Sequence, residues 1–349
     1  MSKSDLLSKL NPAQQEAVEY MGGPLLILAG AGTGKTRTIT RRIAHLVKHQ
    51  NILPSRILAI TFTNKAAQEM RNRITAFVPS TGMWVGTFHA VCARILRMEP
   101  ESVGRTKNFT IIDVEDRRKL LRKLIKKSGL DPQVYRPRRF ESLISNWKQN
   151  CLAPSDLNSE PIYSREEELC AKVYNQYEAS LLMQDSLDFD DLLWKGVQVL
   201  KQDQGRQTPV WINRFDHVLV DEYQDTNQVQ FDMVSMLSKK TRNLAVCGDP
   251  DQSIYRWRGA DISNILNFER DFEGAKIVRL EQNYRSAGNI LKAAQHVIAH
   301  NVNRYPKGLF TTSGDGEPIL LNDAYDEQKE ADMVAMQVAR WIDAGKPSS

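Results

Sequence analysis

Short apolar runs alternate with segments of helical periodicity along most of the chain. The runs have the length of buried β-strands and lie at residues 24–28, 56–62, 217–221, 243–247 and 275–280. Between the first two, Ile39, Ile43, Leu46 and Val47 recur at the spacing that places side chains on one helical face. Strands that alternate with helices are typical of a parallel sheet with helices on both faces. The pattern therefore predicts an α/β fold.

Residues 109–187 interrupt this alternation. After the run FTIID, polar and apolar positions follow helical periodicity almost throughout. The predicted helices cover residues 115–127, 138–150 and 163–184. Asp113 is suited to cap the start of the first helix, and Gly129 is suited to end it. An all-helical block between two α/β stretches predicts an inserted domain.

The C-terminal stretch begins a further α/β pattern. A helix is predicted at 286–300, a strand at 317–321 and another helix at 326–344, and the sequence then stops at Ser349. One or two strands do not make a stable sheet. We therefore expect the chain to stop inside a second α/β domain.

Composition excludes several classes of protein. Of 349 residues, 41% are hydrophobic and 26% are charged, as in ordinary globular proteins, and the length suits two or three domains. The apolar runs are too short to span a membrane, and the N-terminus lacks the apolar core of a signal peptide. The cysteines are scattered, which indicates reduced thiols in a cytoplasmic protein rather than disulfides or a zinc site. They are Cys92, Cys151, Cys170 and Cys247. The net charge of +5 is compatible with a polyanionic partner but does not identify one.

A glycine-rich sequence, AGAGTGKT, occupies residues 29–36 between the first predicted strand and the first predicted helix. Strand, loop and helix in this order are the context of a phosphate-binding P-loop. Its glycines let backbone N–H groups point at phosphate oxygens, and the helix N-terminus adds its positive end. Lys35 would reach the β- and γ-phosphates, and the Thr36 hydroxyl would bind Mg²⁺. Ala29 stands where the strict pattern has glycine. The alternative is a glycine-rich turn that binds nothing.

An acidic pair follows the third predicted strand, in VLVDEYQDTN at 218–227. Asp221 ends the apolar run, so its carboxylate would project from the edge of the sheet where Mg²⁺ sits. Glu222 is suited to orient or deprotonate an attacking water. Phosphoryl transfer depends mainly on positioning and charge neutralisation, so these few groups suffice for hydrolysis. Taken alone, an Asp-Glu pair is common on protein surfaces.

Further motifs follow along the chain. They are LNPAQQEAV (10–18), TFTNKAAQEM (61–70), GTFHA (86–90), LDFDDLL (187–193), GDPDQSIYRWRGAD (248–261) and LEQNYRS (280–286). Together with the P-loop and the acidic pair, these motifs make nearly the whole chain resemble the UvrD/Rep/PcrA-type superfamily 1 DNA helicases. That family consists of ATP-driven motors that move 3′ to 5′ along single-stranded DNA. Thr33, where the family often has serine, is a mild departure.

The resemblance implies roles around ATP. Gln14 would read the adenine edge, and Tyr284 would stack on the base. Arg285 would reach the γ-phosphate from a second motor domain, as an arginine finger does, and Gln252 would sense the γ-phosphate from the first domain. The stretch expected to surround the nucleotide comprises Ala29, Gly30, Ala31, Gly32, Thr33, Gly34, Lys35, Thr36 and Arg37.

The resemblance also implies that Tyr255, Trp257 and Arg258 hold DNA. Aromatic stacking grips a base without reading it, which suits a motor that must move along any sequence. Gln252 precedes this group by only a few residues, so one loop would touch ATP at one end and DNA at the other. The alternative is that Trp257 packs in an interdomain core.

Weaker DNA candidates lie in two further motifs, TFTNKAAQEM and GTFHA. Phe62 could stack on a base, while Thr63, Asn64 and Lys65 could meet the phosphodiester backbone. The alternative for Thr63 or Asn64 is an ordinary helix cap. His89 is a candidate DNA contact from GTFHA, although a single histidine is as often structural.

Charge in the predicted insertion is strongly positive. Residues 115–148 hold eleven Lys or Arg and four Asp or Glu. This surplus could follow duplex phosphates, and a solvated helical face is the alternative. Asp188, Asp190 and Asp191 are interpreted as capping and packing groups rather than a second metal site.

The resemblance implies two RecA-like P-loop NTPase domains with ATP between them. The first would comprise residues 1–108 and 188–280, with the helical insertion at 109–187, and residues 281–349 would begin the second. We expect an ATP- and Mg²⁺-dependent 3′–5′ helicase or translocase that acts on single-stranded DNA and on single-strand/duplex junctions. DNA repair or replication proteins would be its partners. The alternatives are a P-loop ATPase indifferent to DNA and a non-catalytic fragment that binds ATP and DNA.

Overall fold

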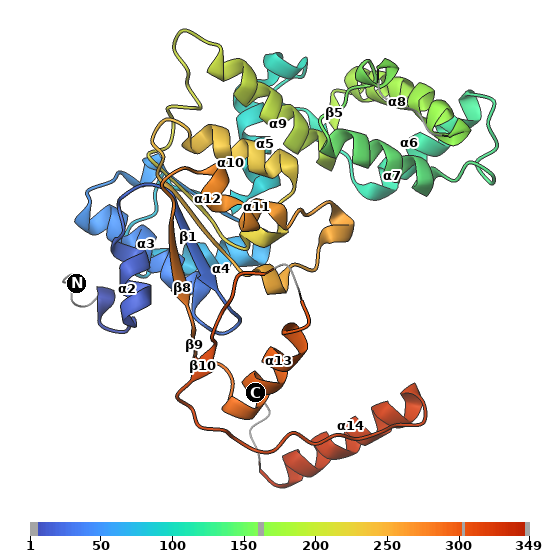
Figure 1. The fold of residues 1–349 in the computed structure, drawn as a ribbon. Helices are drawn as coiled ribbons and strands as arrows, with labels where there is room; N and C mark the ends of the chain where they lie inside the picture. The colour runs from blue at the N-terminus through green and yellow to red at the C-terminus, as the bar shows by residue number, and fades with distance from the viewer. Residues whose placement is uncertain (1–5, 160–163, 302–303, 346–349) are drawn as a thin grey trace.

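The computed structural model describes residues 6–159, 164–301 and 304–345, without the side chains of Asn158 and Arg258. Within these ranges, six strands form a parallel sheet in the order β3-β2-β6-β7-β1-β8 (Figure 1). The strands are β1 (Leu25–Ala29), β2 (Ile57–Thr61), β3 (Trp84–Thr87), β6 (His217–Val220), β7 (Leu244–Gly248) and β8 (Lys276–Leu280). Ile27 of β1 lies opposite Cys247 of β7 on one side and Val278 of the edge strand β8 on the other. The predicted α/β fold is confirmed. Strand β3 was not among the predicted strands, because its short run WVGT carries little apolar signal.

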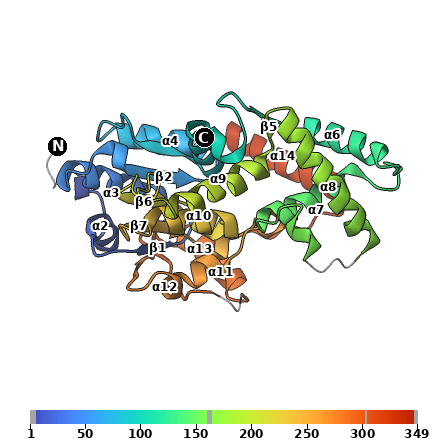
Figure 2. The ribbon, with the colours of Figure 1, turned by 90° about the horizontal axis from the view of Figure 1, so that it is seen from above.

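Helices cover both faces of this sheet (Figure 2). One face is covered by α2 (Pro12–Glu19), α3 (Lys35–His49) and α4 (Asn64–Thr75). The other is covered by α5 (Phe88–Met98), α9 (Phe189–Gln204), α10 (Gln228–Ser238), α11 (Ser263–Leu266) and α12 (Phe268–Asp271). Leu25 and Ile27 join the first core, and Leu26 between them joins the second. Burial on both faces explains why the strands are continuous apolar runs.

A separate core lies in the predicted insertion. It is formed by α6 (Val114–Lys127), α7 (Pro137–Gln149) and α8 (Arg165–Met183). Asp113 caps α6 as predicted, since its side chain accepts a hydrogen bond of 2.9 Å from the Asp116 N–H. The block is not entirely helical, because β4 (Thr110–Ile111) and β5 (Ser186–Leu187) pair at its root. Tyr163, the expected start of the last helix, lies outside the described residues.

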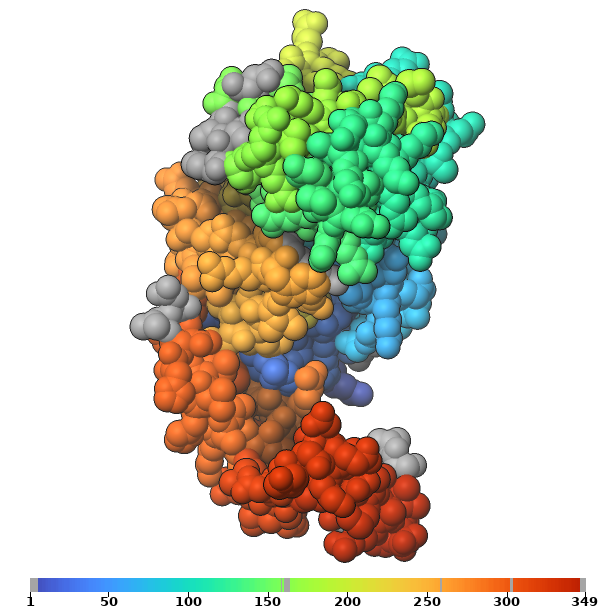
Figure 3. Space-filling model, turned by 90° about the vertical axis from the view of Figure 1, so that its right-hand side faces the viewer, coloured from blue at the N-terminus to red at the C-terminus, as the bar shows by residue number. Residues whose placement is uncertain are grey.

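The C-terminal part contains β9 (Gln282–Asn283), α13 (Gly288–Ile298), β10 (Phe310–Thr311) and α14 (Glu327–Asp343). The strand predicted at 317–321 is wrong: these residues, all of them described, form no strand, and Leu321 is 92% exposed. A strand is stable only when its backbone pairs with a neighbour. Helix α14 lies apart from the sheet (Figure 1), and the red C-terminal surface forms the lower end of the space-filling view (Figure 3). The domain boundaries given above stay a prediction.

Membrane spanning can be assessed for the helices as the structure describes them. None of these described helices combines the length and the apolar character needed to cross a bilayer.

Candidate functional site

The P-loop joins β1 to α3. Strand β1 ends at Ala29 and α3 begins at Lys35, as predicted. Gly32 and Gly34 have φ values of +71° and +88°, in the left-handed region that favours glycine. A Cβ at Gly32 would lie 2.7 Å from the Cβ of Arg285, so the loop is also closely covered from outside. Glycine is therefore required there for both backbone conformation and space.

Three predicted catalytic side chains meet beyond this loop. Lys35 Nζ lies 3.1 Å from Glu222 Oε2 and 3.1 Å from Gln252 Oε1. Burial is the largest influence on the Lys35 pKa and lowers it, but Glu222, Cys247 and Asp221 together raise the pKa above its ordinary value. Lys35 is therefore held in its charged form.

Asp221 lies directly after β6, where the sequence placed the metal carboxylate. It is buried, and its Oδ2 accepts a hydrogen bond of 3.3 Å from Thr36 Oγ1. Burial and then the charge of Glu222 raise the pKa of Asp221 to about 6. A cation at this point would favour the ionised carboxylate, and carboxylate and hydroxyl oxygens are ligands that suit Mg²⁺. Among the described residues no cluster of three His, Cys, Asp or Glu could enclose a metal, so phosphate and water would complete its shell.

Glu222 has a backbone conformation that is rare for a residue with a side chain. Its φ is +53°, and its N–H donates to Asp221 Oδ1 at 3.0 Å. Gln224 Nε2 donates to Glu222 Oε2 at 2.9 Å. Strain of this kind persists only where surrounding contacts enforce it, and it is concentrated at functional sites.

The segment after β8 lies directly on the P-loop. Asn283 Nδ2 donates to the Ala31 carbonyl at 2.7 Å, and the Tyr284 N–H donates to the Gly32 carbonyl at 2.9 Å. Arg285 follows, with its N–H bound to Asn283 Oδ1 at 2.8 Å. Tyr284 and Arg285 are thus brought to the P-loop. The motif LEQNYRS included Asn283, but the sequence did not reveal that its amide makes this contact.

Gln14 is buried against the same loop. Its Nε2 donates to the Thr33 carbonyl at 2.9 Å, and its Oε1 accepts from the Asn11 N–H at 3.1 Å. These bonds hold the P-loop and cap α2, so contact with adenine stays a prediction. Arg37 lies half-buried in the first turn of α3.

Aromatic rings from two loops stack beside this site. Phe62 and Tyr255 lie with ring centroids 5.6 Å apart and planes 15° from parallel, and Trp257 lies 6.4 Å from Tyr255. Trp257 is 74% exposed, so it is not packed in a core of the described residues, while the interdomain core stays an alternative. The side chain of Arg258 lies outside the described residues.

The two weaker DNA candidates lie at the starts of α4 and α5. Thr63 Oγ1 accepts from the Ala66 N–H at 3.1 Å, so Thr63 is a helix cap, while Asn64 and Lys65 are exposed beside it. Burial lowers the pKa of His89 despite the nearby Asp190, which favours a neutral ring.

Phe189 is a candidate DNA contact that was not predicted from the sequence. It opens α9, is 47% exposed and lies edge-on to His89 at 6.0 Å. An exposed aromatic side chain at the first position of a helix was the available signal. The surrounding motif LDFDDLL predicts only capping and packing groups.

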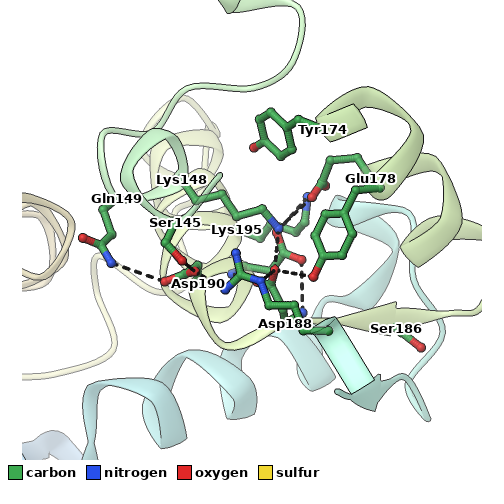
Figure 4. Close-up of polar contacts among 12 residues, drawn as sticks. Ser145, Lys148, Gln149, Tyr174, Glu178, Ser186, Asp188, Asp190 and Lys195 are labelled. Carbon is green, nitrogen blue, oxygen red and sulfur yellow. Dashed lines mark hydrogen bonds and ion pairs between the residues drawn. The ribbon is translucent and has the colours of Figure 1, made fainter. Parts of the chain in front are cut away.

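The aspartates of LDFDDLL have the structural role that was predicted. Asp188 caps α9, accepting from the Asp191 N–H at 2.8 Å. Lys148 Nζ lies 2.9 Å from Asp188 Oδ2 and 2.8 Å from Asp191 Oδ1 (Figure 4). Asp190 accepts from Arg117 at 2.7 Å.

The basic surplus of the insertion is therefore partly internal, since Lys148 and Arg117 are both buried. Several of its other cations are exposed and available to solvent. They are Arg122, Lys123, Lys126, Lys127, Arg136 and Arg138.

Comparison with known proteins shows two matching family models. Residues 10–273 match the UvrD/REP helicase N-terminal domain, and residues 278–348 match the UvrD-like helicase C-terminal domain. A protein of Leuconostoc citreum named ATP-dependent DNA helicase PcrA is 47% identical over 97% of this chain and 45% of its own length. Proteins of the same name from Staphylococcus epidermidis and Staphylococcus aureus are 43% identical, over 99% and 98% of this chain and 47% of their own lengths. The chain thus spans about half the length of these relatives.

Proposed function

The chain belongs to the UvrD/REP helicase family, and from this premise we propose that it carries the ATP site and part of the DNA track of a 3′–5′ DNA helicase. Its relatives are named as ATP-dependent DNA helicases, and the chain aligns with them over almost its whole length. We infer the same activity for this protein.

One observation carries the proposal: a single loop reaches from the P-loop lysine to the exposed aromatic rings. Gln252 bonds to Lys35, and three residues later Tyr255 stacks on Phe62. A phosphate that draws Lys35 away from Gln252 would therefore act on the same loop that grips the bases. This connection favours a DNA motor over a P-loop ATPase that is indifferent to DNA.

The side chains at the P-loop are suited to hydrolyse ATP. When bound at Thr36 and Asp221, Mg²⁺ would neutralise charge on the phosphates. Lys35 holds its positive charge toward the phosphate site, and Glu222 is placed to orient or deprotonate a water. Arg285 would add a cation from the C-terminal part, as arginine fingers do.

The DNA track would run over Phe62, Tyr255 and Trp257, with His89 and Phe189 extending it towards the insertion. Exposed cations of the insertion would meet the duplex at a single-strand/duplex junction. Because DNA is the proposed partner, we also expect a cytoplasmic location and contacts with DNA repair or replication proteins.

The first test compares Trp257→Ala with Gln252→Ala. Trp257→Ala should lose about 1–3 kcal/mol of single-stranded DNA affinity, or roughly 5- to 150-fold, with little dependence on base sequence. Its hydrolysis of ATP without DNA should persist, because it contacts no phosphate. Gln252→Ala should keep its nucleotide-free DNA affinity but lose the stimulation of hydrolysis by DNA. Fluorescence anisotropy and a coupled ATPase assay measure the two effects.

Tyr325→Ala is the matched control, since it removes an aromatic ring that is 98% exposed and belongs to none of the motifs of the site. DNA affinity should not change in this variant. An unchanged affinity in a folded Trp257→Ala protein would remove the stacking role. ATP hydrolysis that DNA does not stimulate in the unmodified chain would favour the DNA-indifferent ATPase instead.

A further inference from the structure

In the C-terminal part, the side chain of Lys307 is buried against the loop that carries Gln252. The Lys307 side chain is 2% exposed, and its ammonium forms ion pairs with Asp249 and, at 2.8 Å, with Asp251 Oδ2. Arg304 lies 3.1 Å from the same Asp251 oxygen. The side chain of Asp249 is 4% exposed and that of Asp251 is 9% exposed. A buried charge is stable only when it is paired, so these contacts constrain one another closely.

The same aspartate sets the orientation of Gln252. Gln252 Nε2 donates to Asp249 Oδ2 at 2.6 Å, which leaves Oε1 facing Lys35 Nζ at 3.1 Å. A side-chain amide has one donor end and one acceptor end, so fixing the first fixes the second. A continuous chain of polar contacts therefore runs from Lys35 through Gln252 and Asp249 to Lys307.

Residues 304–309 are anchored on either side of Lys307. Tyr305 donates from its hydroxyl to the Leu266 carbonyl at 3.1 Å. At the other end Leu309 packs on the P-loop so closely that a Cβ at Gly30 would lie 2.7 Å from its Cδ2. A cavity of about 220 Å³ lies alongside, lined in part by Ala31, Gln252 and Lys307. Gln252 thus has space to turn, and residues 304–309 form one wall of that space.

We propose that Lys307 is a positioning residue for Gln252: it holds Asp249, which accepts one N–H of Gln252 Nε2, so that the second N–H of this amide donates to the γ-phosphate, and it carries any movement of Gln252 to residues 304–309. This inference rests on the proposed function, because it takes Gln252 as the group that meets the γ-phosphate. It assigns a role to a residue outside the motifs recognised in the sequence. The link also gives the C-terminal part a direct contact with the loop that holds Tyr255 and Trp257.

The test measures how strongly the 349-residue chain prefers a triphosphate to a diphosphate. Calorimetric titrations with Mg²⁺ and either ADP or the non-hydrolysable analogue AMP-PNP give two Kd values, and their ratio reports the γ-phosphate contact. Lys307→Met should shift this ratio towards ADP by about tenfold or more, the size expected when a hydrogen bond to a charged group is misaligned. The Kd for ADP should change little. Lys307→Arg, which keeps the charge, should restore the ratio.

Matched variants separate this role from a structural one. Lys292→Met removes a lysine from an exposed ion pair with Asp315 in the same part of the chain and should leave both Kd values unchanged. Gln252→Ala is the reference for complete loss of γ-phosphate sensing. A thermal melt of each variant shows whether it is folded.

The outcomes distinguish the inference from the function on which it rests. A folded Lys307→Met protein with an unchanged ratio, beside a Gln252→Ala protein with a lost one, overturns the role of Lys307 alone. Equal weakening of ADP and AMP-PNP, or failure of Lys307→Arg to restore the ratio, also overturns it. Absence of a γ-phosphate contribution in both the unmodified chain and Gln252→Ala overturns the proposed role of Gln252 itself.

Discussion

The single residue Lys148 joins the insertion to α9, one of the helices that cover the sheet. Its side chain has no exposed area, and its ammonium lies 2.7 to 2.9 Å from oxygens of Glu178, Asp188 and Asp191. Burial and the charge of Asp188 raise the pKa of Asp191, whereas Lys148 and Arg117 outweigh burial and lower the pKa of Asp188. The two carboxyls therefore titrate as a pair around one cation. This cluster joins α7 and α8 to the start of α9 (Figure 4).

Replacing Lys148 by methionine should therefore be severely destabilising. The change leaves buried carboxylates without their cation, and breaking such a pair costs about 3–5 kcal/mol of unfolding free energy. Urea denaturation followed by circular dichroism measures the loss. Lys172→Met is the control, because its ion pair with Glu168 is exposed and should contribute little to the unfolding free energy. Losses of similar size in the two variants would contradict the account of the cluster.

Strand β6 shows how burial within an element controls ionisation. His217 begins this strand and is 3% exposed. Burial and then the charge of Arg42 lower its pKa to about 4 from an ordinary value of 6.5. The folded chain thus holds His217 neutral, whereas the unfolded chain protonates it near pH 6.5. A depressed histidine pKa stabilises the fold above pH 6.5, and that contribution is lost as the pH falls towards 4.

His217→Gln should remove this pH dependence. Each unit of pKa shift corresponds to 1.36 kcal/mol, so the fall from 6.5 to about 4 amounts to about 3 kcal/mol. The unmodified chain should lose about that much unfolding free energy relative to the variant between pH 7 and pH 4. Urea denaturation of both proteins across this pH range measures the difference between their unfolding free energies. Groups that titrate equally in the two proteins cancel from this difference. A constant difference at all pH values would show that His217 is not held neutral.

The whole molecule combines strongly and weakly packed parts. The sheet and the insertion each have a buried core, and Asn283, Tyr284 and Leu309 contact the P-loop. Helix α14, by contrast, has no buried residue along its described length, and Trp341 and Ile342 are about half exposed. Local stability follows buried apolar contact, so α14 should open without the rest.

Limited proteolysis should therefore cleave residues 317–345, which include α14, before it cleaves within the other described helices. The remaining core should melt at the same temperature, because no buried contact is lost with the cleaved segment. Mass spectrometry of early trypsin fragments identifies the sites. Helix α8, which has basic residues and a buried face, serves as the internal comparison. Cleavage of α8 as early as α14 would contradict the difference in packing.

Several features of the protein could be derived from the sequence alone because near neighbours determine them. Continuous apolar runs identified most strands of the sheet, since strands buried on both faces need apolar side chains at successive positions. Gly32 and Gly34 marked the P-loop, because only glycine accepts positive φ without strain. Asp113 marked a helix start, because its carboxylate bonds to an N–H three residues away. The P-loop and the end of the third predicted strand indicated Lys35 and Asp221, and the family resemblance added Gln252 to the same site.

Other features depend on which distant segments meet, and only the tertiary structure decided them. Phe62 stacks on Tyr255, Asn283 binds the Ala31 carbonyl, and Lys307 pairs with Asp249 across long stretches of chain. A lysine or aspartate looks the same in sequence whether it ends in solvent or in a buried pair, as Lys148 and the basic surplus of the insertion show. The strand expected at 317–321 failed for the same reason: a strand exists only where a neighbour pairs with it, and an apolar run does not contain its neighbour. Local chemistry could therefore be predicted, but the partners of each charge and of each strand edge could not.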